Sequence, residues 1–239
     1  MAIPRKTPAV KPAAGKSATA PRRRGVGRPR AGATDVRAKL LDAAIGQFTR
    51  VGIHASSLRA IAAAAGVTPA MLHYYFGDKR QMTTAIIDER LLPALASLRA
   101  RIEAGGDDPA ALARTFVEGI GEVIAAHPWL PSLWVREVLC EGGALREIVF
   151  RRVIPQMPQI LAQRFTAARS RGRLAAGLDP RLLVVSLVGL TLFPAAGAPI
   201  WQRIFDARDL DADALRAHTL ALLEHGLDAR HAVRRRKRP

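Results

Sequence analysis

Apolar residues recur at intervals of three and four positions along the chain from Thr34 to about residue 228. The first stripe of this kind stops near Gly52 and comprises Leu41, Ala44, Ile45 and Phe48. Such spacing places apolar side chains on one face of an α-helix. Because no segment shows the two-residue alternation of a half-buried strand, the pattern predicts an all-α protein.

Capping residues and helix breakers divide this region into about nine predicted helices. Ser56 or Ser57 is placed to cap a short second helix that ends at Gly66. A third begins at Thr68–Pro69, and a fourth begins at Asp78 and continues to Gly105. The later helices begin at Asp108–Pro109, near residue 131, near residue 144, at Asp179–Pro180, and at Asp211 or Asp213.

The positive charge of the chain is concentrated at its two ends. The formal net charge is +17, but residues 1–33 and 229–239 hold fifteen of the 37 Lys and Arg residues and no acidic residue. Residues 34–228 therefore carry 22 basic against 20 acidic side chains. Clustered Lys and Arg gain affinity for polyanions by displacing counterions, so a nucleic-acid partner is favoured over plain solvation or an anionic membrane.

Several other classes of protein are not favoured. A single cysteine, Cys140, excludes an internal disulfide and a cysteine-rich zinc site. We find no catalytic set or phosphate loop, so we expect no enzyme, no cofactor and no metal. Residues 182–202 are uncharged, but Pro194, Gly197 and Pro199 interrupt them, so a buried helix is favoured over stable membrane insertion. No export signal is apparent, and we expect a cytoplasmic protein.

The second and third predicted helices have the spacing of a helix-turn-helix, because only Gly66-Val67-Thr68 separates them. Gly66 suits a turn that requires positive φ, and Ala62 is small enough for the two helices to cross closely. The sequence from Ser56 to Lys79, SSLRAIAAAAGVTPAMLHYYFGDK, resembles the DNA-binding signature of the tetracycline-repressor (TetR) family of bacterial regulators. The resemblance extends from Thr34 to about Ile87.

This resemblance implies a domain organisation. Residues 1–33 would be a disordered basic arm, and residues 34–80 a three-helix head that contains the helix-turn-helix. Residues 81–228 would form a helical domain for effector binding and dimerisation, and residues 229–239 a basic tail. The implied partners are double-stranded DNA, a second copy of the chain and a small-molecule effector, in a bacterial, nucleoid-associated protein.

The resemblance also implies which residues contact DNA, with the third helix in the major groove. The alternative for each residue is ordinary capping or surface filling. Leu72 and Phe76 would be core, and packing is favoured for Tyr75. His73 would face a base edge or a phosphate. The other predicted contacts are Arg59, Pro69, Ala70 and Met71 with bases, and Ser57, Thr68, Tyr74 and Lys79 with phosphates.

Near the end of the basic arm, a Gly-Arg-Pro sequence resembles an AT-hook. Arg28 and Arg30 would there enter the minor groove, or attract phosphates without specificity.

In the predicted C-terminal domain, the resemblance implies an effector cavity and a dimer interface. The predicted cavity residues are Phe116, Ile120, Trp134, Glu137 and Met157. Glu137 would either neutralise a cationic ligand or, as we favour, pair with an arginine such as Arg136 or Arg151. The predicted interface residues are Leu183, Leu187, Leu190, Leu215 and Leu222.

The sequence thus predicts a DNA-binding regulator, most simply a repressor that an effector releases from a palindromic operator. A looser resemblance of residues 133–139, 178–182 and 192–194 to regulators of export genes suggests control of efflux. The alternative is an architectural protein that coats DNA through its basic tails.

Overall fold

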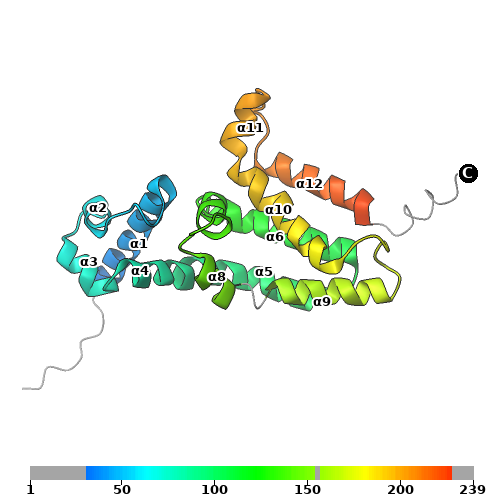
Figure 1. The fold of residues 1–239 in the computed structure, drawn as a ribbon, viewed down its shortest axis with the longest axis horizontal. Coiled ribbons are helices and arrows are strands. Elements are labelled where there is room, and N and C mark those ends of the chain that lie inside the picture. Colours follow the sequence, from blue (N-terminus) through cyan, green and yellow to red (C-terminus); the bar gives the residue numbers. More distant parts are fainter. Residues whose placement is uncertain (1–30, 154–156, 228–239) are drawn as a thin grey trace, which may run out of the picture.

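The computed structural model describes residues 31–153 and 157–227. The basic arm with Arg28 and Arg30, and the basic tail, lie outside these residues. Within the described ranges the chain is helical and contains no strand, which confirms the all-α class. Figure 1 shows a small group of helices at one end of an elongated helical body.

The head consists of α1 (Ala31–Val51), α2 (Leu58–Ala64) and α3 (Pro69–Phe76). Ser57 caps α2 through a hydrogen bond from the Ala60 amide, and Thr68 caps α3 through one from the Met71 amide. Gly66, at φ +69°, makes the turn between α2 and α3. The apolar residues buried at their meeting point are Leu40, Leu41, Ala44, Phe48, Ile61, Ala62, Leu72 and Phe76.

One nearly continuous helical segment leads from the head into the body. It comprises α4 (Lys79–Ile86), the π-helical turn η1 (Ile87–Leu91) and α5 (Leu92–Ala104). Asp78 caps α4 by accepting from the Gln81 amide, as predicted. Pro93, which lacks an N–H group, lies in the first turn of α5, directly after the wide π-helical turn.

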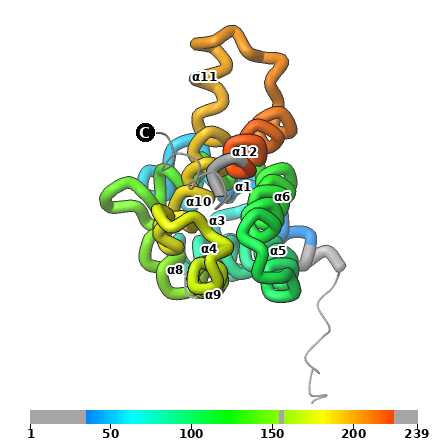
Figure 2. The backbone as a smooth tube through the Cα atoms, turned by 90° about the vertical axis from the view of Figure 1, so that its right-hand side faces the viewer, coloured from blue at the N-terminus to red at the C-terminus, as the bar shows by residue number. Residues whose placement is uncertain are grey.

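The remaining helices form the body. They are α6 (Pro109–Ala126), α7 (Leu130–Trp134), the π-helical turn η2 (Val135–Leu139), α8 (Arg146–Arg152), α9 (Met157–Ser170), α10 (Pro180–Ala196), α11 (Ala198–Ile204) and α12 (Ala212–Leu227). Helix α6 packs against α5 on one side and α12 on the other, and α10 packs against α9, α6 and α12. Figure 2, along the body, shows α5 and α9 in one layer beneath α6 and α10.

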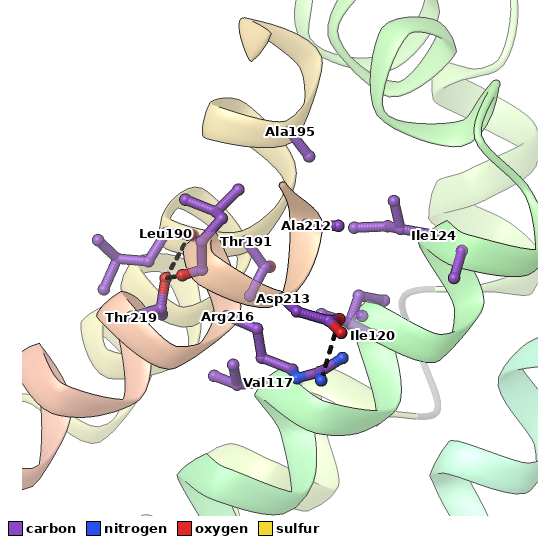
Figure 3. Close-up of a pocket in the computed structure, with 13 residues that line it drawn as sticks. Val117, Ile120, Ile124, Leu190, Thr191, Ala195, Ala212, Asp213, Arg216 and Thr219 are labelled. Atoms are coloured by element: carbon purple, nitrogen blue, oxygen red, sulfur yellow. Dashed lines mark hydrogen bonds and ion pairs between the residues drawn. The ribbon is translucent and has the colours of Figure 1, made fainter. Parts of the chain in front are cut away.

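The body differs from the prediction in two places. The long seventh helix is two helices, α8 and α9. Helix α11 was not predicted, because α10 continues through Pro194 before a bend of 69°. Two interactions stabilise this bend. In the first, the Trp201 Nε1–H donates to the Pro194 carbonyl at 2.8 Å. In the second, the Thr219 hydroxyl lies 3.4 Å from the Leu190 carbonyl, which has no backbone donor at position 194 because Pro194 lacks an N–H group (Figure 3).

Among the described residues, no single helix has both the length and the hydropathy of a bilayer span. Helices α10 and α11 meet that test only when they are taken together, across their bend.

Candidate DNA-binding surface and effector cavity

Helix α3 buries one face in the head and exposes the other. Leu72 and Phe76 are buried, as predicted. The exposed face carries the five α3 residues that were predicted to contact DNA, namely Pro69, Ala70, Met71, His73 and Tyr74. Tyr74 is 85% exposed, which is unusual for a large aromatic side chain. The helix therefore presents a mixed apolar and hydrogen-bonding surface to an outside partner.

The imidazole of His73 is held in one tautomer. Its Nδ1 lies 2.6 Å from the Gly77 carbonyl oxygen. A carbonyl oxygen only accepts hydrogen bonds, so Nδ1 must carry the proton, and in the neutral ring Nε2 is an acceptor. An acceptor suits the amino group of adenine or cytosine in the major groove better than it suits a phosphate oxygen.

Tyr75 and Phe76 are fixed by contacts within the head. The Tyr75 ring is half-buried and packs edge-on against Tyr74, with centroids 5.4 Å apart. From α1, Arg37 donates to the Tyr75 carbonyl at 3.1 Å, and its guanidinium lies 4.4 Å from the centroid of the Phe76 ring. The aromatic cluster thus anchors α3 on α1. No local pattern indicated Arg37, because this contact joins positions far apart in the chain.

The predicted contacts outside α3 occupy different environments. Arg59 is exposed on α2. The side-chain oxygens of Ser57 and Thr68 already accept the capping hydrogen bonds, but each hydroxyl hydrogen remains able to donate to a phosphate. Lys79 is half-buried, and its ammonium donates to the carbonyls of His54 and Ser56 at 2.9 and 2.8 Å. Two of its three N–H groups therefore hold the loop before α2.

Four of the five predicted effector residues line one cavity in the body: Phe116, Ile120, Trp134 and Met157. The volume of the cavity itself is about 70 Å³. Its other lining residues are Leu91, Leu95, Leu130, Val153, Pro158, Leu161, Val184, Val188 and Leu192. The uniformly apolar lining favours an apolar ligand.

Glu137 does not line this cavity. Its carboxylate faces the junction of head and body, where Oε1 accepts from the Ile53 amide at 2.9 Å and Oε2 from the Ala144 amide at 3.1 Å. The groups seen to satisfy this acid are backbone amides, and not the arginine that we had favoured. The geometry also places it away from a cationic ligand in the cavity.

A second hollow lies between α6, α10 and α12 (Figure 3). Ile120 lines both spaces. An ion pair between Arg216 and Asp213, 3.1 Å apart, stands at the second hollow. The Thr191 hydroxyl points to a backbone carbonyl of its own helix, and the Thr219 hydroxyl to carbonyls of α12 and α10, so both are satisfied without a ligand. The larger, wholly apolar cavity is therefore the better candidate for an effector.

The outward face of α10 is not the predicted one. Leu183 and Leu187 were expected at a dimer interface, but they are 6% and 0% exposed in the core of the protomer. Helical geometry instead turns Leu182, Val185 and Phe193 outward, each about two-thirds exposed. On α12, Leu222 is exposed, and with the predicted Leu190 and Leu215 it lines a groove between α10, α11 and α12.

These features define a helix-turn-helix head on a separate helical body that encloses an apolar cavity. Residues 40–86 match the sequence model of the bacterial regulatory proteins of the TetR family. Over this segment the chain therefore resembles the TetR family, whose members combine a helix-turn-helix domain with an effector-binding C-terminal domain. The sequence has no significant match among curated proteins.

Solved structures share this fold. One is NalD, the secondary repressor of the MexAB-OprM multidrug efflux pump in Pseudomonas aeruginosa. It is 25% identical, with 83% of this chain and 98% of that chain covered and a TM-score of 0.61. Another is FadR of Bacillus subtilis in complex with stearoyl-CoA, 20% identical, with 80% and 98% covered and a TM-score of 0.62. A third is a regulator of Saccharomonospora viridis in complex with choline, 20% identical, with 82% and 98% covered and a TM-score of 0.57.

The environment of Lys79 yields a test on the protein without DNA. Lys79→Met keeps the aliphatic stem but removes both bonds to the loop, and we expect the free energy of unfolding to fall by about 1–3 kcal/mol. Urea unfolding measures this. The control is Arg80→Met, which removes a neighbouring exposed charge and should change it by less than about 0.5 kcal/mol. Equal stabilities of the two variants would mean that Lys79 acts on phosphates alone.

Proposed function

We propose that the protein is a dimeric repressor that binds a near-palindromic operator through α3 and is released by an apolar effector. The observation that carries this proposal is the two-faced α3: Leu72 and Phe76 fix it to the head, and its opposite face is exposed and able to contact base edges. In a helix-turn-helix dimer, two such helices enter successive major grooves about 34 Å apart.

Within this proposal, each exposed residue has a role that follows from its chemistry. Arg59 donates to a guanine edge, and the neutral His73 accepts from an adenine or cytosine amino group. Pro69, Ala70 and Met71 contact thymine methyl groups. Phosphate contacts from Ser57, Thr68, Tyr74 and the remaining N–H of Lys79 set the register of the helix on the duplex.

The dimer would form through the outward faces of α10 and α12. Leu182, Val185 and Phe193 make an apolar stripe along α10, and Leu222 adds to it from α12. Exposed apolar side chains gathered on one helix face favour a protein interface. Pairing with the same stripe of a second copy would give a self-complementary, two-fold interface.

The effector would be a largely apolar molecule. The lining of the cavity offers dispersion contacts and the single indole N–H of Trp134, so little in the described wall favours a charged group. A drug-like compound is consistent with the resemblance to NalD, and an acyl chain with that to FadR; we favour the former because NalD is the more similar in sequence. With a drug-like effector, the genes that the protein controls would be efflux genes.

Release requires the effector to bind one dimer shape better than another. A ligand with equal affinity for both shapes would shift nothing, however tightly it bound. We propose that the filled cavity favours a spacing of the heads that no longer matches the operator.

Removal of Arg59 tests sequence reading by the head. In the full chain, Arg59→Ala should weaken the preference for DNA from upstream of the gene over a scrambled duplex by about tenfold or more. Fluorescence anisotropy at about 0.2 M salt measures this preference, because such salt suppresses nonspecific contacts. Arg208→Ala removes an exposed arginine far from the head and should leave the preference intact. Identical behaviour of both variants would favour the architectural alternative.

Trp134 provides a test of the cavity. The uncharged fluorophore N-phenylnaphthylamine should bind the protein, and Trp134→Leu should weaken its binding about tenfold by removing contact area. Trp201→Leu makes the same change outside the cavity, and we expect probe affinity to be retained. Loss of affinity only in the Trp201 variant would move the effector site to the groove beside α11.

A charge on the α10 stripe tests the interface. Phe193→Glu would bury an unpaired carboxylate between two copies, so we expect monomers at micromolar concentration in light scattering after gel filtration. Phe150→Glu, on α8, replaces a phenylalanine of similar exposure and should leave the dimer unchanged. A dimeric Phe193 variant would place the interface elsewhere.

A further inference from the structure

Glu137 is the most deeply buried acidic residue among those described, at 3% exposed, and it belongs to neither the DNA-binding face nor the cavity. It lies on η2, and its two oxygens accept from two different parts of the chain. The Ile53 amide belongs to the loop that follows α1 in the head, and the Ala144 amide to the loop that follows η2 in the body. A carboxylate that only accepts fits this pair of donors, because a protonated acid would need an acceptor for its own hydrogen.

Two further hydrogen bonds join the head and the body beside these loops. Arg136, next to Glu137, donates to the Thr49 carbonyl at 3.1 Å, in the last turn of α1. The His54 Nε2 lies 3.2 Å from the Gly142 carbonyl oxygen. Three contacts, at Thr49, Ile53 and His54, therefore attach the head to the body at this point. The contact between Ile53 and Glu137 is the buried one.

Two glycines allow the loops to approach Glu137 this closely. Gly52 has φ +85°, and a Cβ atom there would lie 3.2 Å from the Glu137 Oε1. A Cβ atom on Gly143 would lie 2.3 Å from the Glu137 backbone oxygen, which is closer than such atoms come in proteins. Both sides of the junction are thus shaped around this one residue.

The junction lies beside the effector cavity. Trp134 and Leu130 line that cavity, and they also line a narrow apolar gap whose other walls include Phe48 and Ile53 of the head. Trp134 directly precedes η2, the turn that carries Glu137. A displacement of Trp134 by a ligand would therefore be passed to η2 within a single helical turn.

We infer that Glu137 is a positioning residue that locks the head in the orientation in which two heads of a dimer match the operator. This inference rests on the proposed dimeric repressor and deepens it, since it assigns the group through which the cavity acts on the head. A lone head needs no lock to bind one half-site, whereas a full palindrome requires both heads to be held at a fixed spacing. Loss of the lock should therefore reduce the advantage of the full site.

The test compares two duplexes with the full chain: the native upstream operator, and the same duplex with one half scrambled. We expect wild-type protein to prefer the full operator. In Glu137→Gln an amide N–H₂ faces a backbone N–H, so we expect the ratio of full-site to half-site affinity to fall by about tenfold. Half-site affinity should change by less than about twofold. Glu141→Gln makes the same chemical change on an exposed residue of the adjoining loop, and it should retain the wild-type ratio.

Each other outcome overturns a defined part of the account. A Glu137→Gln protein that loses thermal stability but keeps the wild-type ratio would show a merely structural role, and the lock would be rejected. Wild-type protein without any preference for the full duplex would reject the dimeric repressor and the lock together. If Glu137→Gln does not fold, Arg136→Met removes the exposed bond to Thr49 instead, and we expect about a threefold fall in the same ratio; an unchanged ratio would again reject the lock.

Discussion

The burial of Leu72 and Phe76 against α1 and α2 is the constraint on which the DNA-binding surface depends. Helix α3 has only eight residues, so it has little stability apart from its packing. Once these two side chains are buried, helical periodicity turns His73 and Tyr74 outward. The density of rings in this stretch therefore serves two purposes: some rings attach the helix, and others are displayed.

The orientation of the head likewise depends on how the head is attached to the body. The segment α4–η1–α5 connects head and body along the chain, and the Glu137 junction connects them again at the C-terminal end of α1. Ion pairs of Arg37 with Glu89 and of Arg90 with Asp42 are more exposed, and exposed pairs of this kind contribute little. A head held at two points has a defined orientation, which is what recognition of a spaced palindrome requires.

Local signals made much of the fold predictable. Ser57, Thr68, Asp78, Asp108 and Asp179 cap helices where their sequence context indicated, because a cap depends on residues only a few positions away. Four of the five expected cavity residues do line one space, since an apolar helix face in the middle of a domain must be enclosed. The prediction of which face of α10 points outward was wrong for Leu183 and Leu187. An uncharged helix has no contrast in polarity between its inner and outer faces, so its sequence does not indicate which face is buried.

Contacts between distant residues were not predictable from the sequence. The sequence does not show that Lys79 reaches the carbonyls of His54 and Ser56, or that Glu137 meets the Ile53 amide. Pattern reasoning assigned Lys79 to a phosphate and favoured an arginine partner for Glu137, because it had no means to locate the backbone acceptors and donors that these charges meet. The bend that creates α11 likewise depends on Trp201 and Thr219, which lie well beyond Pro194 in the chain.

The central claim is that two copies of α3, one from each protomer of a dimer, together read a specific DNA sequence. The most direct measurement is the binding of the wild-type chain to DNA from upstream of its gene and to a scrambled duplex, at about 0.2 M salt, with the number of protomers on each duplex determined by sedimentation. The account predicts tight binding of two protomers to the native duplex alone. Equal affinity for both duplexes, with protomers added in proportion to duplex length, would contradict it.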